Sequence, residues 1–124
     1  MWKLKRTNTC GDLRAEHAGK TVVLNGWVDA RRNFGNLIFI DLRDRYGRTQ
    51  VLFSPDRAPA LLDQASKLGK EWVVAVKGVV AKRDADTVNA KIPTGGIEVD
   101  ATELEILNEA KTPPFEVTER INVS

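Results

Sequence analysis

Apolar and polar residues alternate along five stretches of this chain, and a repeat of two residues is the pattern of a half-buried β-strand. Glycine, proline and asparagine residues lie between several of the stretches, as expected at turns. The connections among the first three stretches are short, which predicts an antiparallel meander. The predicted strands are residues 21–32, 37–44, 48–54, 72–83 and 97–107.

One face of each of the first three predicted strands is mostly apolar, and we expect these faces to point into a common interior. The last strand differs, because its alternation changes phase between Ala101 and Leu104, which predicts a β-bulge there. The expected interior residues are Val22, Leu24, Gly26 and Val28, then Ile38, Ile40 and Leu42, then Thr49, Val51 and Phe53.

Leucine and alanine residues recur at helical spacing after the third strand, which predicts a helix over residues 56–68 that Gly69 ends. An earlier segment, residues 11–20, predicts one or two helical turns, with Asp12 as the N-cap and Gly19 as the stop. The polar segment between the last two strands has no helical period and is predicted to be a loop.

The resulting order is three strands, a helix and two strands, so the predicted fold class is all-β with one helix. Long strands that bend at internal glycines and at a bulge favour a small closed barrel over an open sheet. A five-stranded Greek-key barrel with a helix between strands 3 and 4 is the OB-fold, which we predict for residues 1–110. An SH3-like barrel is the alternative, although it would not usually carry a helix of this length. Residues 111–124 begin with KTPPF, which breaks the pattern, and we expect a linker there.

Composition narrows the class of protein. Hydrophobic residues make up 42% and charged residues 29% of the chain, as in ordinary soluble domains. No apolar run approaches the roughly 20 residues of a membrane span. No secretory signal is readable at the start, so we expect a cytoplasmic location and no membrane partner. The single cysteine, Cys10, excludes an internal disulfide or a cysteine-based zinc cluster and is expected to be a small buried residue.

Phe39 shares a strand face with Asp41 rather than with the apolar residues beside it. If Ile38 and Ile40 point to the interior, the ring of Phe39 lies on the polar outer face of the second strand. Gln50, on the third strand, is expected to point outward as well. Because an exposed ring stacks on a single-stranded base and an amide can read its Watson–Crick edge, the pair indicates RNA binding.

Basic residues lie at the ends of the strands around this pair, where cations can hold RNA phosphates. They are Arg31, Arg32, Arg48, Lys82 and Arg83. The net charge of +2 neither requires nor excludes a nucleic-acid partner.

A structural interpretation of the same residues stays open. An outward phenylalanine can pack under a loop or a neighbouring domain, and clustered arginines are more often solvated than functional. Trp27 also has outward parity and could cover one end of the barrel. Trp2 and Trp72 are interpreted as packing residues.

The run GWVDARRNFGNLIFIDLRDRYGRTQVLF, together with CGDLRAEHAGKTVVLNGW before it, closely resembles the N-terminal anticodon-binding domain of bacterial aspartyl-tRNA synthetases. The resemblance extends from about Arg6 to Phe115. Related lysyl and asparaginyl enzymes share the barrel with a looser pattern, whereas LIFIDLRDR-x-G-x-x-QV after R-R-N-x-G is similar to the aspartyl type.

The resemblance implies that five residues bind the anticodon. Phe39 matches the aromatic residue that stacks on the central base, a uridine, and Gln50 matches the residue that hydrogen-bonds that base. Arg32 matches an arginine that contacts the anticodon. Glu98 matches an acidic residue that reads a base through its donor groups, and Arg83 matches a basic residue near the loop that receives the RNA.

Further residues are candidates for contacts with the RNA backbone. The family often has three basic residues after GWV-x, and here the first of these is Ala30, so one cation of the family pattern is missing. The candidates are Arg31, Arg48 and Lys82, with Asn89 and Lys91 in the loop as weaker ones.

The enzymes of this family activate aspartate with ATP and Mg²⁺ and then esterify tRNA, so the resemblance implies that residues 111–124 lead to an absent class II catalytic domain. ATP and Mg²⁺ are expected only there, and this chain is expected to hold no catalytic residue, cofactor or metal. Asp41 and Asp44 are the candidate metal carboxylates. We expect them instead to orient Arg43 and Arg45 or to cap the turn.

The favoured hypothesis is recognition of the anticodon loop of aspartate tRNA by one domain of an enzyme that is expected to be a homodimer. One alternative is an OB module that binds single-stranded nucleic acid of any sequence. Another is a protein-interaction barrel that uses Phe39 and Trp27 as an apolar anchor. Recognition of asparagine tRNA in addition stays open at this point.

Overall fold

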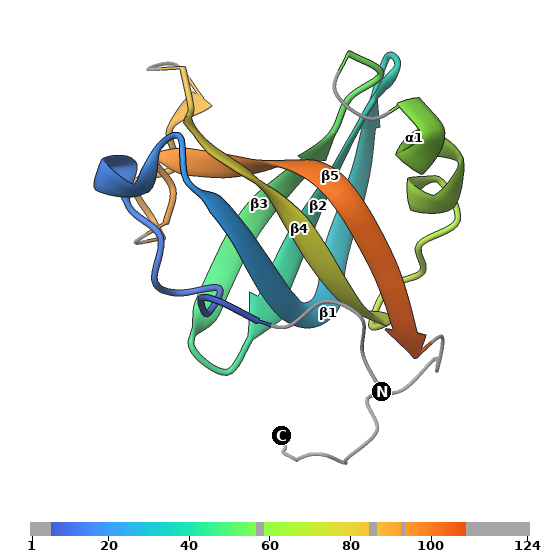
Figure 1. The fold of residues 1–124 in the computed structure, drawn as a ribbon, viewed down its shortest axis with the longest axis horizontal. Coiled ribbons are helices and arrows are strands. Elements are labelled where there is room, and N and C mark those ends of the chain that lie inside the picture. The colour runs from blue at the N-terminus through green and yellow to red at the C-terminus, as the bar shows by residue number, and fades with distance from the viewer. Residues whose placement is uncertain (1–5, 57–58, 85–86, 93, 109–124) are drawn as a thin grey trace.

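The computed structural model describes residues 6–56, 59–84, 87–92 and 94–108, and its five strands close into one barrel (Figure 1). Neighbouring strands around the barrel follow the order β1-β2-β3-β5-β4. The predicted OB-fold is confirmed. The strands are β1 (Thr21–Phe34), β2 (Leu37–Asp44), β3 (Gly47–Phe53), β4 (Val73–Lys82) and β5 (Ile97–Asn108), and α1 (Pro59–Ala65) follows β3 in the chain and precedes β4.

The long strand β1 pairs with two other strands: its first half pairs with β4 and its second half pairs with β2. The register with β2 shifts between Val28 and Ala30, which leaves Asp29 as an extra residue. Strand β5 pairs antiparallel with β4 and parallel with β3, where Leu52 lies opposite Asp100. The β3–β5 pairing closes the barrel and brings residues that are distant in the sequence to one outer face.

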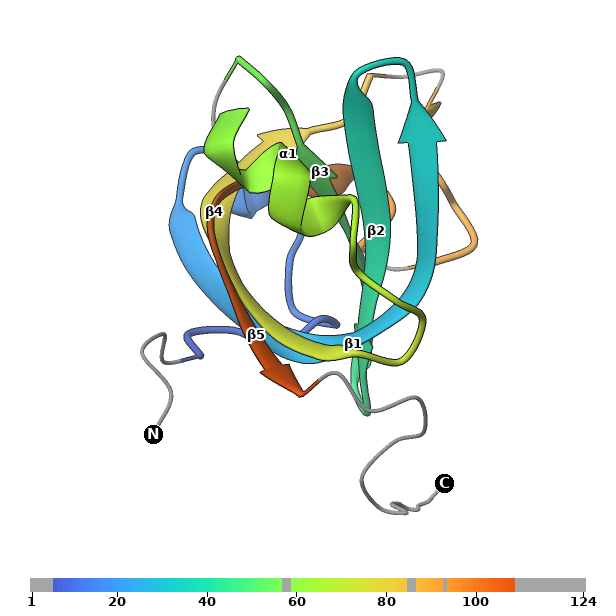
Figure 2. The same cartoon turned by 90° about the vertical axis from the view of Figure 1, so that its right-hand side faces the viewer.

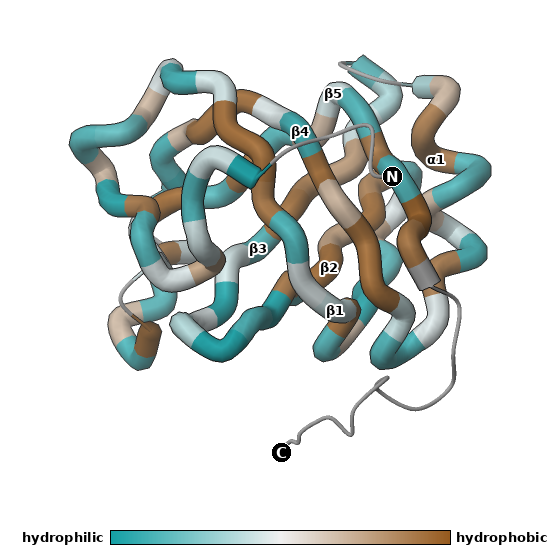
Figure 3. Tube along the Cα trace, turned by 60° about the horizontal axis from the view of Figure 1, so that its bottom comes forward, coloured by the Kyte–Doolittle hydropathy of each residue, from teal (hydrophilic) through white to brown (hydrophobic). Residues whose placement is uncertain are grey.

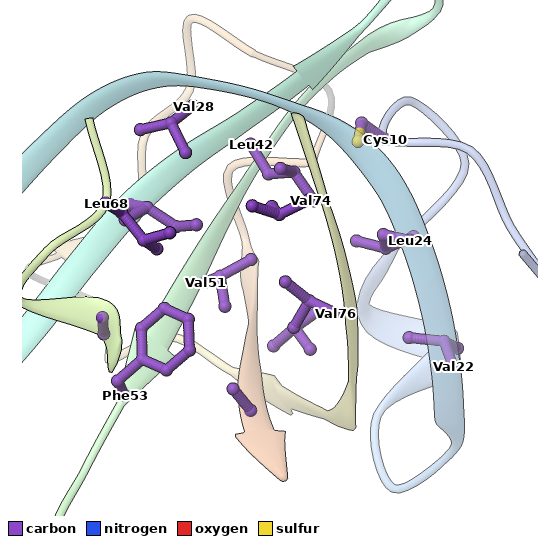
Figure 4. Close-up of a cluster of buried hydrophobic side chains, with 14 of the residues drawn as sticks. Cys10, Val22, Leu24, Val28, Leu42, Val51, Phe53, Leu68, Val74 and Val76 are labelled. Carbon is purple, nitrogen blue, oxygen red and sulfur yellow. The ribbon is translucent and has the colours of Figure 1, made fainter. Parts of the chain in front are cut away.

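The interior of the barrel is the predicted apolar face of the strands. Hydrophobic and hydrophilic positions alternate along the trace in Figure 3, and the buried side chains converge in Figure 4. Trp72 packs against this core, as predicted, together with Leu61 and Leu62 of α1. Completely buried strand residues include Leu24, Val28, Ile40, Leu42, Val51, Phe53, Val74, Val76, Ile97 and Val99.

Helix α1 is shorter than the prediction of residues 56–68. It begins at Pro59, a residue that is well suited to the first helical position because its ring presets φ and its missing N–H needs no partner there. After Ala65 the hydrogen-bond spacing shortens from four residues to three, as in a 3-10 turn, because the amide of Leu68 donates to the carbonyl of Ala65. Figure 2 shows α1 lying across the barrel, where Ala65 and Leu68 are buried.

The segment before β1 forms a single 3-10 turn, Ala15–His17, rather than one or two α-helical turns. The predicted N-cap is wrong, because Arg14 occupies that position and its amide donates to Nδ1 of His17. Asp12 instead accepts a hydrogen bond from the amide of Thr9 at 2.9 Å. Gly19 has a φ of 92° and ends the turn, as predicted.

The predicted bulge in the last strand is confirmed. Lys77 pairs with Glu103 and Gly78 pairs with Ala101, so Thr102 is the extra residue. A Cβ atom at Gly78 would lie 2.3 Å from the carbonyl oxygen of Asp100, so only glycine fits beside the bulge. The bulge and the glycine together let β4 and β5 curl around the core.

Cys10 is completely buried in the core, as predicted. Burial raises the pKa of its thiol far above the usual range, and the neighbouring carboxylate of Asp44 adds to the increase. That carboxylate accepts hydrogen bonds from the amides of Cys10, Tyr46 and Gly47 at 2.8–3.1 Å. Asp44 therefore caps the turn between β2 and β3, which is one of the two roles expected for it.

Candidate nucleic-acid interface

A groove of about 760 Å³ runs over the outer face of β1, β2 and β3 and is bordered by the ends of β4 and β5. Its floor combines apolar and polar side chains, and its border carries two cations. The residues that line it are Arg32, Asn33, Phe34, Leu37, Phe39, Gln50, Leu52, Lys82, Arg83, Asp84, Thr87 and Glu98.

Strand register explains why these side chains meet. Phe39 lies opposite Arg32 on β1 and opposite Leu52 on β3, so the three side chains form one row across the sheet. The next row on the same face contains Asp41 and Gln50, which lie opposite each other. Because side chains alternate between faces with a period of two residues, both rows point outward.

The apolar part of the groove is centred on Phe39, whose ring is half-buried on the outer face of β2. The orientation predicted from the alternation is therefore confirmed. Phe34, at the end of β1, has 74% of its surface exposed. Two aromatic rings and the side chains of Leu37 and Leu52 thus form an apolar surface within a groove whose other lining residues are polar.

The polar part is a continuous hydrogen-bonded network, named here the groove cluster: Asp41, Arg32, Gln50 and Glu98. The two terminal nitrogens of Arg32 donate to the carboxylate of Asp41 at 2.9 and 3.2 Å. Nη2 of Arg32 also donates to Oε1 of Gln50 at 3.1 Å. Nε2 of Gln50 then donates to Oε1 of Glu98 at 3.0 Å. The amide of Gln50, only 9% exposed, therefore lies between a cation and a carboxylate.

Burial has the largest influence on the pKa of Glu98 in the groove cluster. It raises the pKa of Glu98, and this effect outweighs the hydrogen bond from Gln50, which lowers the pKa. The nearby carboxylate of Asp100 raises it further, while the guanidinium of Arg83 opposes the increase. The hydrogen bonds to Asp41 raise the pKa of Arg32, so Arg32 stays charged.

Two cations lie at the border of the groove, at the end of β4. The side chain of Lys82 is exposed, and Arg83 is half-buried with an Nε that has no hydrogen-bond partner among the described residues. The amide of Arg83 donates to the carbonyl of Gly96 at 2.9 Å, which fixes the base of the loop that follows. Both cations face the same groove as the ring of Phe39.

Of the predicted site residues, the structure brings Phe39, Gln50, Arg32, Glu98 and Arg83 into one groove, together with Lys82. Four further candidates lie outside it. Strand alternation gives the face of a sheet but not the position along it, so the contacts of these four with RNA remain predictions. They are Arg31, Arg48, Asn89 and Lys91.

Each of the four has another contact in the structure. Arg31 donates to the carbonyl of Ser66, just after α1. Arg48 lies 3.9 Å from the carboxylate of Asp29. In the loop, the amide of Lys91 donates to Oδ1 of Asn89 at 3.0 Å.

Asp41 was expected to orient Arg43, and this expectation is wrong. Its carboxylate pairs with Arg32 across the strands rather than with Arg43 on its own strand, whose nearest carboxylate is Asp29 at 3.8 Å. The diagonal neighbour on β1 is within reach of the planar guanidinium, and the two-pronged contact favours it. Within the described ranges no group of three or more acidic, histidine or cysteine side chains could hold a metal ion.

Sequence reasoning missed Phe34, because it ended the first strand at Arg32 and interpreted residues 33–36 as a turn. It placed Leu37 on the same strand face as Phe39 but did not name it as a site residue. The turn is only Gly35–Asn36, so Phe34 and Leu37 pair with each other and lengthen the hairpin. Gly35 has a φ of 61°, which suits this two-residue turn. A phenylalanine next to a turn glycine is the signal that could have identified the longer strand.

Two tryptophans from the sequence analysis do not contribute to the groove. Trp2 lies outside the described residues, and Trp27 is half-buried and does not line the groove.

Comparison with known proteins gives consistent results. The aspartate–tRNA(Asp/Asn) ligase of Desulfosudis oleivorans is 57% identical over 124 residues, which is 100% of this chain and 21% of the relative. The aspartate–tRNA ligase of Listeria monocytogenes is 49% identical over 120 residues, 97% of this chain and 20% of the relative. This chain therefore spans about a fifth of the length of the curated relatives that it matches.

A solved structure shows the same arrangement of strands. The asparaginyl-tRNA synthetase of Pyrococcus horikoshii matches 86% of this chain, and 24% of that chain, with a TM-score of 0.70 and 30% identity. None of the described helices is long and apolar enough to span a membrane.

The similarity to aspartate–tRNA ligases over the whole chain confirms the resemblance inferred from the sequence. A family model described as an OB-fold nucleic acid binding domain matches residues 22–107, which include all five strands apart from their outermost residues. The chain thus belongs to the family of OB-fold nucleic acid binding domains.

Proposed function

We propose that this chain is the anticodon-binding, non-catalytic domain of an aspartate–tRNA ligase and that its groove receives the anticodon loop of aspartate tRNA. The observation that supports this most directly is the position of the Phe39 ring, which faces the same groove as the fixed amide of Gln50. A ring gives stacking with any base, whereas an amide with a defined direction discriminates between bases.

Gln50 keeps part of its hydrogen-bonding capacity free. Its carbonyl oxygen has two acceptor positions, of which Arg32 occupies one, and its nitrogen has two hydrogens, of which Glu98 takes one. One donor and one acceptor of the amide remain for a ligand. The Watson–Crick edge of uracil offers an N–H next to a carbonyl oxygen, so a central uridine stacked on Phe39 fits this amide.

Glu98 and the two cations at the border support the flanking contacts. A carboxylate accepts hydrogen bonds from the amino groups of guanine or cytosine, which are the bases on either side of the uridine in the aspartate anticodon GUC. Lys82 and Arg83 line the border of the groove and are placed to hold phosphates.

The aminoacylation reaction belongs, in this proposal, to the part of the enzyme that corresponds to the other four-fifths of the relatives' length. ATP and Mg²⁺ would bind there, and that catalytic domain would be the covalent partner of this one in a cytoplasmic homodimer. The names of the two relatives differ in whether asparagine tRNA is included. Because the asparagine anticodon, GUU, shares its first two bases with GUC, the contacts with Phe39 and Gln50 serve either tRNA.

The proposal is tested by titrating isotope-labelled protein with three anticodon stem-loops, carrying GUC, GUU and a changed middle base. We expect shifts of the Phe39 and Gln50 signals with the first RNA. We also expect the change of the middle base to weaken binding by about 1–3 kcal/mol. Equal binding of all three RNAs would identify a sequence-tolerant module instead. No shift at Phe39 with any of them would favour a protein-interaction barrel.

A further inference from the structure

Asp41 does not line the groove, yet it is the first member of the groove cluster. Its side chain is 17% exposed, while that of Arg32 is 50% exposed. Asp41 accepts hydrogen bonds from both terminal nitrogens of Arg32, at 2.9 and 3.2 Å. Such a two-pronged contact fixes the plane of a guanidinium, which on a long flexible side chain would otherwise sample several rotamers.

The fixed guanidinium in turn determines the direction of the amide. Nη2 of Arg32 uses one hydrogen for Asp41 and another for Oε1 of Gln50, while Nε2 of Gln50 donates to Glu98. Reversing the amide of Gln50 would place its N–H₂ against the donors of Arg32 and its oxygen against the carboxylate. Both ends of the amide therefore oppose reversal.

We propose that Asp41 is a positioning residue for base readout, which acts through Arg32 to hold the amide of Gln50 in the one direction that distinguishes the central base. This inference rests on the proposed function, since it concerns the same groove. It assigns to Asp41 a role without any contact with the RNA.

Asp41 also lowers the positive charge of the groove, because it neutralises Arg32. Its removal therefore has two opposite effects on binding. Arg32 becomes free to attract phosphates, so RNA of any sequence binds more tightly and with a steeper salt dependence. The amide loses its fixed direction, so discrimination between middle bases decreases. A residue that only supported the fold would lower affinity and discrimination together.

The variant Asp41→Asn keeps the size of the side chain and removes its charge. The matched control is Asp29→Asn, which changes the net charge equally on the neighbouring strand. Asp29 lies 3.8 and 3.9 Å from Arg43 and Arg48, outside the groove. Both variants and the wild-type 124-residue chain are titrated with the GUC stem-loop and the middle-base variant at several salt concentrations, and their melting temperatures are measured.

For the wild type we expect the two RNAs to differ by roughly 5- to 150-fold in affinity. For Asp41→Asn this ratio should fall to about three-fold or less, with tighter binding of the changed RNA and a melting temperature close to the wild-type value. Asp29→Asn should keep the wild-type ratio. A full wild-type ratio in Asp41→Asn overturns the inference and leaves the proposed function intact, whereas a wild type without discrimination removes both.

If Asp41→Asn does not fold, two measurements on folded protein replace it. The first is the order of the Gln50 side-chain amide in the wild type, measured by ¹⁵N relaxation, which should be as high as that of the backbone. The second is the variant Arg32→Lys, which keeps the charge but lacks the planar fork and should lose discrimination. A mobile amide in the wild type, or full discrimination in Arg32→Lys, overturns the inference.

Discussion

Two carboxylate–arginine groups lie on the first strands of the barrel, and they differ in what surrounds them. In the groove cluster, Asp41 and Arg32 are 2.9 Å apart and continue through a buried amide to Glu98. In the second group, here called the solvated cluster, the carboxylate of Asp29 lies 3.8 Å from Arg43 and 3.9 Å from Arg48. Both groups contain an aspartate beside arginine, but among the described residues only the groove cluster continues to a nearly buried amide, that of Gln50.

The difference shows why charge alone does not identify a site. Exposed ion pairs at almost 4 Å contribute at most about 1 kcal/mol and keep much of their hydration. A pair that is hydrogen-bonded to a nearly buried amide has a fixed geometry and presents that geometry to a ligand. We therefore expect substitutions in the groove cluster to change recognition and equivalent substitutions in the solvated cluster to have little effect.

The largest effect is expected from Arg32→Ala. This change removes a cation from the groove and leaves Asp41 and Oε1 of Gln50 without their shared donor, so affinity for the GUC stem-loop should decrease by about 2–3 kcal/mol. Arg43→Ala, from the solvated cluster, should cost less than about 0.5 kcal/mol. Calorimetric titration of both variants measures the difference, and equal losses would remove the distinction between the two clusters.

A slightly smaller effect is expected from Phe39→Ala. Loss of the stacking surface should weaken binding by about 1–2 kcal/mol without unfolding the barrel, because the ring lies on the outer face. Tyr46→Ala is the control, since this ring is 58% exposed but belongs to the turn between β2 and β3. A collapse of the melting temperature in Phe39→Ala would show instead that the ring is part of the core.

The border of the groove is tested through the salt dependence of binding. The plot of log K against log salt has a negative slope, and Lys82→Ala should make this slope shallower by about 0.7, the value for one contact with a phosphate of a single strand. Lys77 is the matched control on the same strand, because its Nζ lies 3.4 Å from Glu103 and does not line the groove. A slope unchanged by Lys82→Ala would place the phosphates elsewhere.

The smallest effect concerns stability against pH. Burial raises the pKa of Glu98, so the folded chain binds this proton more tightly than the unfolded chain does. The resulting stabilisation is complete below the ordinary glutamate pKa and is lost as the pH rises through the raised value. Glu98→Gln should therefore flatten the dependence of the unfolding free energy on pH over that acidic interval.

Urea denaturation at a series of pH values measures this effect. The substituted side chain keeps an acceptor for Nε2 of Gln50, so the hydrogen bond can persist in the variant. Glu103→Gln, on the exposed part of the same strand, serves as the control. If the two variants had the same pH profile, burial of Glu98 would have no influence on the stability of the chain.

Much of the fold follows from local pattern. Residue alternation within a few positions gives the orientation of Phe39 and the bulge at Thr102. The glycine in the fourth strand, Gly78, is equally visible and allows the strand to bend beside that bulge. The predicted N-cap at Asp12 was wrong although its actual contact is also local. Short polar side chains also bind nearby amides outside helices, and here the amide of Thr9 lies within reach.

The site was less accessible from the sequence, because its network joins distant residues. Gln50 and Glu98 are 48 residues apart, and they meet only because β5 closes the barrel against β3. The resemblance to a family supplied both residues, but not their mutual hydrogen bond. The partner of Asp41 was missed because the diagonal neighbour across two strands depends on register, which alternation alone does not give.

The sealed position of Cys10 has a practical consequence. Because its thiol has no exposed surface and a raised pKa, we expect Cys10 to form little thiolate at neutral pH and not to react with maleimide dyes. A cysteine introduced at Val88, which is 47% exposed in the loop next to Thr87 of the groove, would then carry the only fluorophore. If RNA binds in the groove as proposed, Val88→Cys would convert the chain into an optical sensor of that binding.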